Sequence, residues 1–222
     1  MASGSTRSLA PAWSTCFVAA GMTLAGCAST QPNLVARHPW IEDPSTALVS
    51  EDLIIRIRGP RTDVAAIFSF AFRQAPSDRV LTFPIPPACT PTSDFAATLE
   101  GAGNTPTRLR TTPSSDPSTI PMGPIGQRFD IHVPSEHFQE HDGKLVVRYS
   151  QICDDTFEYT LLSGAYWHGP IGRLEVLVTD PDHRVLSASV EKQPAHRVRA
   201  DRYTWTFRDI EPRGGVVLQL AP

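Results

Sequence analysis

The 222-residue sequence has little of several features that often indicate a function. Charged residues make up 19% of the chain, aromatic residues 8%, there are four cysteines, and the formal net charge is -3. The lack of a basic excess argues against a nucleic-acid-binding protein, because such proteins usually carry a surplus of Lys and Arg. No glycine-rich phosphate-binding motif occurs, and no apolar run beyond the N-terminal segment is long enough for a membrane-spanning helix.

The N-terminal segment contains no acidic residue, and the first one in the chain is Glu42. A short basic start is followed by an uncharged, mostly apolar stretch, an order typical of a secretory signal. The stretch ends in Leu24-Ala25-Gly26-Cys27, which resembles the lipobox of bacterial lipoproteins. The resemblance implies cleavage before Cys27 and attachment of lipid to its thiol. The alternative is an ordinary signal peptide that is cut near Ala28.

The lipobox resemblance divides the N-terminal region into two parts. Residues 1–26 are expected to be the signal peptide, and residues 27–46 a lipid anchor and a flexible, proline-containing tether. Long acyl chains such as palmitate contribute about 0.8 kcal/mol for each buried methylene, so the anchor would be permanent in practice. In enterobacteria an Asp after the lipid cysteine retains a lipoprotein in the inner membrane. Ala28 at that position therefore favours the outer membrane.

Two cysteines remain once Cys16 is assigned to the signal and Cys27 to the lipid. In an exported protein, which folds in an oxidising compartment, the pair Cys89 and Cys153 predicts one disulfide. Two free buried thiols are the alternative. The two cysteines alone are too few ligands for a metal site.

The part of the chain after residue 46 follows a period-two pattern that predicts many short β-strands and almost no helix. Apolar residues alternate with other side chains, and most prolines lie at strand ends or between strands. The expected fold is all-β, an antiparallel β-sandwich. Two sandwich-like regions are expected, residues 47–153 and 154–222, and a single larger sandwich is the alternative.

Several short motifs resemble those of a class of secreted bacterial β-sandwich proteins. Val49-Ser50-Glu51-Asp52 leads one strand, and Phe83-Pro84 closes another. The stretch from Ser163 to Gly172 resembles a "TG-x-x-W-x-G-P-I" turn, and Ile210-Glu211-Pro212 resembles the closing "x-E-P". The class has no established activity, so the resemblance implies a fold and an exported location only.

One motif could form a catalytic metal site. His137, Glu140 and His141 spell H-x-x-E-H, in which two imidazoles on one helix face bind zinc and the glutamate acts as a general base. Glu211 would be a candidate third ligand. The motif falls between two expected strands rather than in a long helix, so we interpret it as a solvated connection. A zinc-dependent hydrolase remains an alternative function.

A second motif could bind a small molecule or a glycan. Tyr166, Trp167 and His168 precede Gly169-Pro170 and could offer aromatic faces and hydrogen-bond donors. A structural corner of the sandwich explains the same residues. Acidic turns at residues 154–155 and 180–182 could hold calcium weakly, but such turns are more often solvated.

These observations favour a non-enzymatic envelope lipoprotein that acts as a structural or protein-interaction module. No catalytic residue, metal or cofactor is predicted. The expected partners are a membrane, through the lipid on Cys27, and an envelope protein, but no nucleic acid. The Tyr166–His168 turn and the segment 101–124, interpreted as a long surface loop, are the candidate contact surfaces.

Overall fold

The computed structural model describes residues 35–36, 46–72, 79–92, 94–100, 105–114, 126–134, 142–161, 170–194 and 196–222. Every regular element within these ranges is a β-strand. The strands form one large sheet and two small ones, which confirms the prediction of an all-β sandwich. The described residues contain no helix that is long and apolar enough to cross a membrane.

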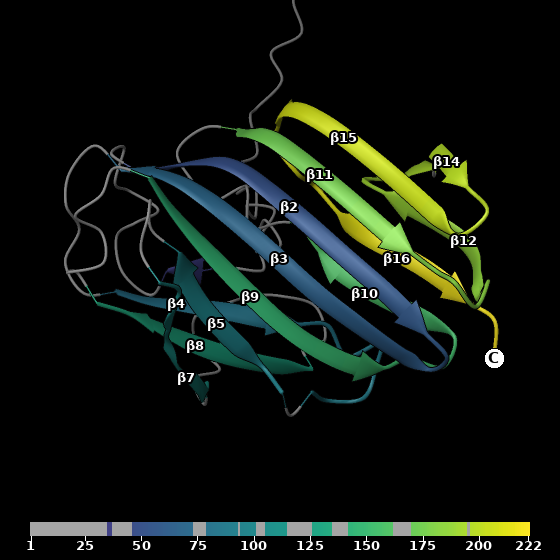
Figure 1. Ribbon diagram of the computed structural model, residues 1–222, viewed down its shortest axis with the longest axis horizontal. Coiled ribbons are helices and arrows are strands. Elements are labelled where there is room, and N and C mark those ends of the chain that lie inside the picture. The colour runs from purple at the N-terminus through teal and green to yellow at the C-terminus, as the bar shows by residue number, and fades with distance from the viewer. Residues whose placement is uncertain are drawn as a thin grey trace, which may run out of the picture.

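The large sheet has eight strands and runs the length of the molecule (Figure 1). Its strand order is β14-β15-β11-β2-β3-β9-β5-β6. In that order the strands are His196–Arg199, Arg202–Ile210, Ile171–Thr179, Thr46–Arg58, Arg61–Phe72, Asp142–Ile152, Ala96–Glu100 and Thr107–Arg108.

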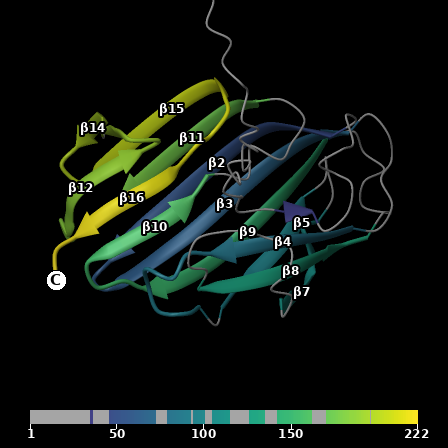
Figure 2. The same cartoon turned by 180° about the vertical axis from the view of Figure 1, so that it is seen from behind.

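Two four-stranded sheets lie over one face of the large sheet (Figure 2). The first, in the order β1-β4-β8-β7, comprises Val35–Ala36, Arg79–Ile85, Gln127–Val133 and Arg110–Pro113. The second, in the order β10-β16-β12-β13, comprises Thr156–Thr160, Gly215–Leu220, Val185–Val190 and Gln193–Pro194.

The core lies between the large sheet and the two small sheets. Alternate residues of β5, β11 and β16 point into it, as the period-two pattern predicts. The buried apolar side chains form one continuous cluster that includes residues from both the 47–153 and the 154–222 region. The two regions therefore share one core. Its largest fully buried members include Phe68, Phe83, Phe157 and Tyr159.

One strand pair of the large sheet departs from the antiparallel prediction. β2 and β11 are parallel, with Val176 opposite Leu53 and Val178 opposite Ile55. This pair joins strands from the two regions in one continuous sheet. Side-chain alternation is the same in parallel and antiparallel strands, so the sequence pattern contained no information about this direction.

Turns and bulges explain further details of the fold. Gly59, with a φ of 50°, begins the two-residue β2–β3 turn, a backbone conformation that glycine favours. The alternation of Leu186 with Ala188 and Val190 predicts that all three face the core. A bulge in β12 between Val185 and Ser187 instead turns Leu186 outward, where it is 70% exposed, so the prediction is wrong for Leu186. The segment 101–124 is also not one loop, because it contains β6 and β7.

Candidate interaction surface

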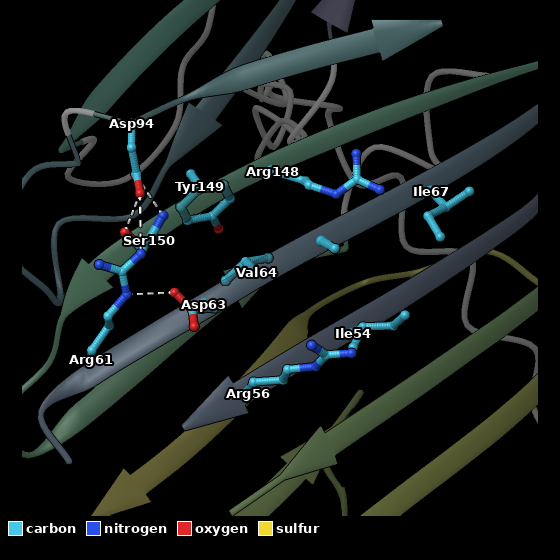
Figure 3. Close-up of a pocket in the computed structure, with 11 residues that line it drawn as sticks. Ile54, Arg56, Arg61, Asp63, Val64, Ile67, Asp94, Arg148, Tyr149 and Ser150 are labelled. Carbon is cyan, nitrogen blue, oxygen red and sulfur yellow. Dashed lines mark hydrogen bonds and ion pairs between the residues drawn. The ribbon is translucent and has the colours of Figure 1, made fainter. Parts of the chain in front are cut away.

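The face of the large sheet that points away from the small sheets carries a pocket of about 490 Å³ over β2, β3 and β9 (Figure 3). Ile54, Ala65 and Ile67 contribute apolar side chains to its lining, and all three are half-buried. Arg56 and Arg148 also line it and are exposed. We call this pocket the Arg56–Arg148 groove.

Strand register determines how these residues are arranged. Ala65 lies opposite Ile54 on one side and Arg148 on the other, so the three form one row across the sheet. Asp63 lies opposite Arg56 in the next row. From strand spacing and rise, the Cα atoms of Arg56 and Arg148 are about 12 Å apart, diagonally across β3.

One side of the groove is held by a hydrogen-bonded cluster around Asp94. The Asp94 carboxylate accepts bonds from Ser150 N at 2.8 Å, Ser150 Oγ at 2.5 Å and Thr92 Oγ1 at 2.6 Å. Burial acts to raise the pKa of Asp94, but these hydrogen bonds and the Arg61 guanidinium lower it below its ordinary value. The carboxylate is therefore ionised and fixed near neutral pH.

Arg61 links this cluster to the neighbouring acid. Its Nε donates to Asp63 Oδ1 at 2.7 Å, and its Nη2 lies 3.4 Å from Asp94 Oδ2. The hydrogen bond to Asp63 raises the pKa of Arg61. The Arg61 charge is thus balanced within the protein, although its side chain is exposed.

Arg56 and Arg148 differ from Arg61 in this respect. Within the described residues neither guanidinium makes a hydrogen bond or an ion pair, and Figure 3 draws none for them. Both guanidiniums are therefore available to an anionic ligand at the groove.

Basic side chains also outnumber acidic ones over the rest of this side of the large sheet, which we call the outer face. The outer face comprises the outward-pointing side chains of β15, β11, β2, β3, β9, β5 and β6. Among the side chains that the structure describes, its basic residues are Arg56, Arg58, Arg61, Arg108, Lys144, Arg148, Arg173, Arg202 and Arg208, against the acidic Asp52, Asp63, Glu100 and Glu175. Basic residues thus outnumber acidic ones on this surface, nine to five when Asp94 beside the groove is included, on a chain whose net charge is -3.

Ion pairs use most of the acids of the outer face but few of its bases. Arg173 lies 3.1 Å from Asp52 and 3.0 Å from Glu175, and Asp63 is paired with Arg61. Glu100 is the remaining acid among the described side chains of these strands. Among the described residues, the other basic side chains of the outer face have no hydrogen-bond or ion-pair partner, namely Arg56, Arg58, Arg108, Lys144, Arg148, Arg202 and Arg208.

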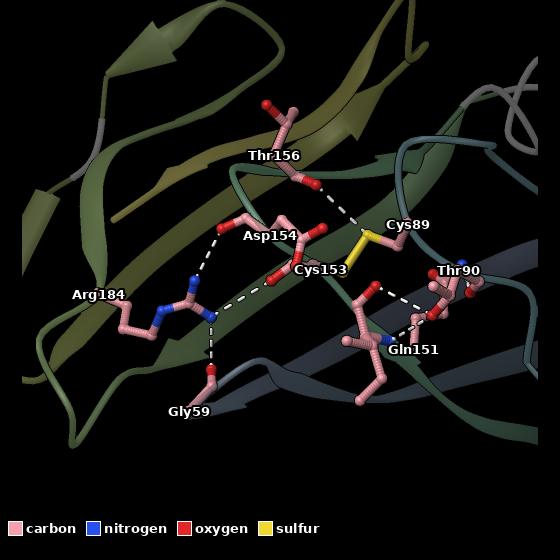
Figure 4. Close-up of a disulfide and its surroundings, with 9 residues drawn as sticks. Gly59, Cys89, Thr90, Gln151, Cys153, Asp154, Thr156 and Arg184 are labelled. Atoms are coloured by element: carbon pink, nitrogen blue, oxygen red, sulfur yellow. Dashed lines mark hydrogen bonds between the residues drawn. A yellow bond between two sulfur atoms is a disulfide. The ribbon is translucent and has the colours of Figure 1, made fainter. Parts of the chain in front are cut away.

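The predicted disulfide is confirmed and lies beside the β2–β3 turn, where Cys153 N donates to Pro60 O at 2.8 Å (Figure 4). Cys89 and Cys153 are joined with an S–S distance of 2.09 Å. Beside them the Arg184 guanidinium donates to the main-chain oxygens of Gly59 at 2.6 Å, Asp154 at 2.7 Å and Ala221 at 2.8 Å. These bonds connect the β2–β3 turn, the disulfide segment and the C-terminal residues.

The carboxylates of the acidic turn at residues 180–182, considered for calcium, have structural partners. The Asp180 carboxylate accepts from Arg184 N at 2.9 Å and Val185 N at 2.7 Å, and Asp182 accepts from Gly59 N at 2.6 Å. Within the part of the chain that the structure describes, no three His, Cys, Asp or Glu residues are grouped so that they could hold a metal ion.

Several predicted site residues lie outside the described residues. They are the lipidation residue Cys27, the turn residues Tyr166, Trp167 and His168, and the zinc-motif residues His137, Glu140 and His141. The proposed third ligand, Glu211, is described and exposed. The predictions for lipidation, ligand binding and zinc therefore stay predictions.

Comparisons with known proteins found no matching protein family and no matching curated protein. Among solved structures, the chain is similar to an M1 zinc metallopeptidase from Deinococcus radiodurans, with a TM-score of 0.40 and 16% identity. It is also similar to leukotriene A4 hydrolase from Saccharomyces cerevisiae, with a TM-score of 0.48 and 8% identity. The matches cover 79% and 88% of this chain, but 42% and 31% of those chains.

Sequence reasoning missed the outer face altogether. A signal was present in β3, where Ala65 and Ile67 make the strand apolar on both of its sides. Arg56, Arg58 and Arg148 each stand at outward positions of strands whose inward residues were identified. Combining the outward positions required the strand order, which the sequence pattern alone does not contain.

Proposed function

We propose that this protein is a non-enzymatic interaction module, attached to a bacterial envelope membrane by lipid on Cys27, that contacts its target through the outer face. The lipobox resemblance supports the attachment. The outer membrane is the proposed location, because Ala28 follows Cys27.

The observation that carries the interaction role is the excess of unpaired basic side chains on the outer face. Exposed guanidiniums without partners stabilise the fold little, and they repel one another across a sheet. Such an arrangement is typical of a surface that binds an anionic target. The Arg56–Arg148 groove adds a half-buried apolar floor to this charge.

The outer face can be tested by site-specific photo-crosslinking in the native envelope. A photo-reactive benzoylphenylalanine would replace Thr206, an exposed outward residue of β15. The matched control replaces Ser187, an exposed hydroxyl residue on the outward side of β12 in a small sheet. We expect discrete adducts from position 206 and few from position 187. Equal adducts from both positions would contradict the proposal.

The same preparation tests the non-enzymatic part of the proposal. Metal content is measured in the purified protein and in the variant His137→Ala. We expect no stoichiometric zinc in either sample. Near-stoichiometric zinc that is lost in His137→Ala would overturn the proposal and lead to peptidase assays.

A further inference from the structure

The target of the outer face can be defined more closely from the distribution of its charge. Free bases are spread from Arg108 on β6 to Arg202 and Arg208 on β15. At a strand spacing of about 4.8 Å, this width is roughly 30 Å. The width is several times the Debye length of about 8 Å at physiological salt, so one small anion cannot interact with all of these charges.

The shape of the outer face also limits what could bind it. The face is the broad side of one continuous sheet, and none of the strands that the structure describes packs over it, as Figure 1 shows. An extended peptide would lie along a strip of it and leave most of the free bases unneutralised. A planar array of anions could pair with many of these bases at the same time. Guanidinium groups suit this role, because they bind phosphate through paired hydrogen bonds.

We propose that the outer face binds the anionic phospholipid headgroups of a bilayer, so that the large sheet lies against the membrane and the two small sheets point away from it. The inference rests on the proposed function, since the lipid on Cys27 would hold the face near that membrane. The phosphates bind at the free bases, and Arg56 and Arg148 mark the centre of the contact.

The charge of the small sheets agrees with this orientation. The outward side chains of β10, β16 and β12 include Glu158, Val217 and Gln219, and no Lys or Arg. On the first small sheet, Arg110 lies 3.0 Å from His132, and Arg128 also has an interaction partner. Among the strand residues whose side chains the structure describes, the free basic groups are therefore concentrated on the outer face.

The test uses the full chain with Cys27→Ser, which cannot be lipidated, so that any binding must come from the protein itself. Co-sedimentation is measured with vesicles of phosphatidylcholine alone and with vesicles that also contain phosphatidylglycerol. We expect binding to require phosphatidylglycerol and to weaken as salt is raised. Equal binding to both vesicles would overturn the inference.

A pair of double variants assigns the binding to the outer face. Arg56→Gln with Arg148→Gln should weaken binding roughly 30-fold, because each basic residue at an anionic surface contributes about a factor of five. The control, Lys192→Gln with Arg213→Gln, removes the same charge from exposed positions beside the second small sheet. We expect a change of less than about twofold in the control. Equal losses in both double variants would overturn the inference.

Polyglutamate serves as the competing probe. If polyglutamate binds the outer face and phosphatidylglycerol vesicles do not, the membrane inference is wrong and the target is an acidic protein. The proposed function would survive that result, because discrete crosslinks from position 206 do not depend on which anion is bound. If no discrete crosslinks form from position 206, the interaction role itself is refuted.

Discussion

Two buried tyrosines should respond in opposite directions to the same substitution. Tyr149 and Tyr159 both pack against Phe83, with ring centroids 5.9 and 6.4 Å away. The Tyr159 hydroxyl donates to the buried carboxylate of Glu51 at 3.1 Å. Within the described structure, the Tyr149 hydroxyl is buried and has no hydrogen-bond partner. Substitution by Phe therefore removes a stabilising hydrogen bond at Tyr159, whereas at Tyr149 it removes a buried hydroxyl that has no partner.

The expected magnitudes follow from the burial of the two hydroxyls. Removing one partner of a buried hydrogen bond costs about 1–3 kcal/mol, so Tyr159→Phe should lower the free energy of unfolding by about 2 kcal/mol. A buried hydroxyl without a partner costs about 1–3 kcal/mol. Tyr149→Phe should therefore raise the free energy of unfolding by about 1 kcal/mol. The side-chain volume is nearly unchanged in both variants, so no cavity contributes.

Urea denaturation of the oxidised protein measures both changes. The slope of free energy against urea should match the wild type in each variant, because the area exposed on unfolding is nearly unchanged. Burial raises the pKa of Tyr149, so the wild type should lose stability above about pH 10, where the unfolded tyrosine ionises. Tyr149→Phe should lose less stability there. A loss of stability at pH 7 in both variants would refute the reasoning.

Three further predictions concern the ends of the sheets and the groove. Replacing Cys89 and Cys153 by Ser should lower the free energy of unfolding by roughly 4 kcal/mol, since the disulfide closes a loop with a sequence separation of 64; equal urea midpoints would contradict this. Arg184→Lys should cost about 2 kcal/mol and speed hydrogen exchange in the C-terminal strand, because an ammonium cannot reach the same main-chain oxygens; unchanged exchange would exclude this role. Asp94→Asn should lower stability at pH 7 by about 1 kcal/mol. Because the pKa of Asp94 is lowered in the folded protein, the difference in free energy of unfolding between the wild type and Asp94→Asn should shrink as pH falls below about 4. A difference that grows at acid pH would contradict a stabilising role for the ionised Asp94 carboxylate.

Strand positions were largely predictable because one face of each strand is buried. The alternating apolar residues of Arg79–Ile85 predict a strand, and β4 has these bounds. Its inward residues Leu81, Phe83 and Ile85 are all buried. Period-two alternation identifies such strands whenever one side packs on a core. It failed at Leu186, where a bulge inserts an extra residue and reverses the alternation.

The candidate surface was less predictable because it depends on which strands are neighbours. Arg56 and Arg148 are far apart in sequence and lie near each other because β3 pairs with both β2 and β9. The parallel β2–β11 pair then extends the sheet toward Arg202 and Arg208. The disulfide was predictable, in contrast, because only two cysteines remained to be paired.

The central claim is that lipid on Cys27 holds this module at an envelope membrane. The most direct measurement is the intact mass of the N-terminal peptide, taken from protein isolated from membranes of the expressing bacterium. We predict a chain that begins at Cys27 and carries diacylglyceryl on the thiol, and we predict that Cys27→Ala abolishes both the lipid and the membrane association. A chain cut elsewhere, with an unmodified Cys27 thiol and unchanged fractionation, would contradict the claim.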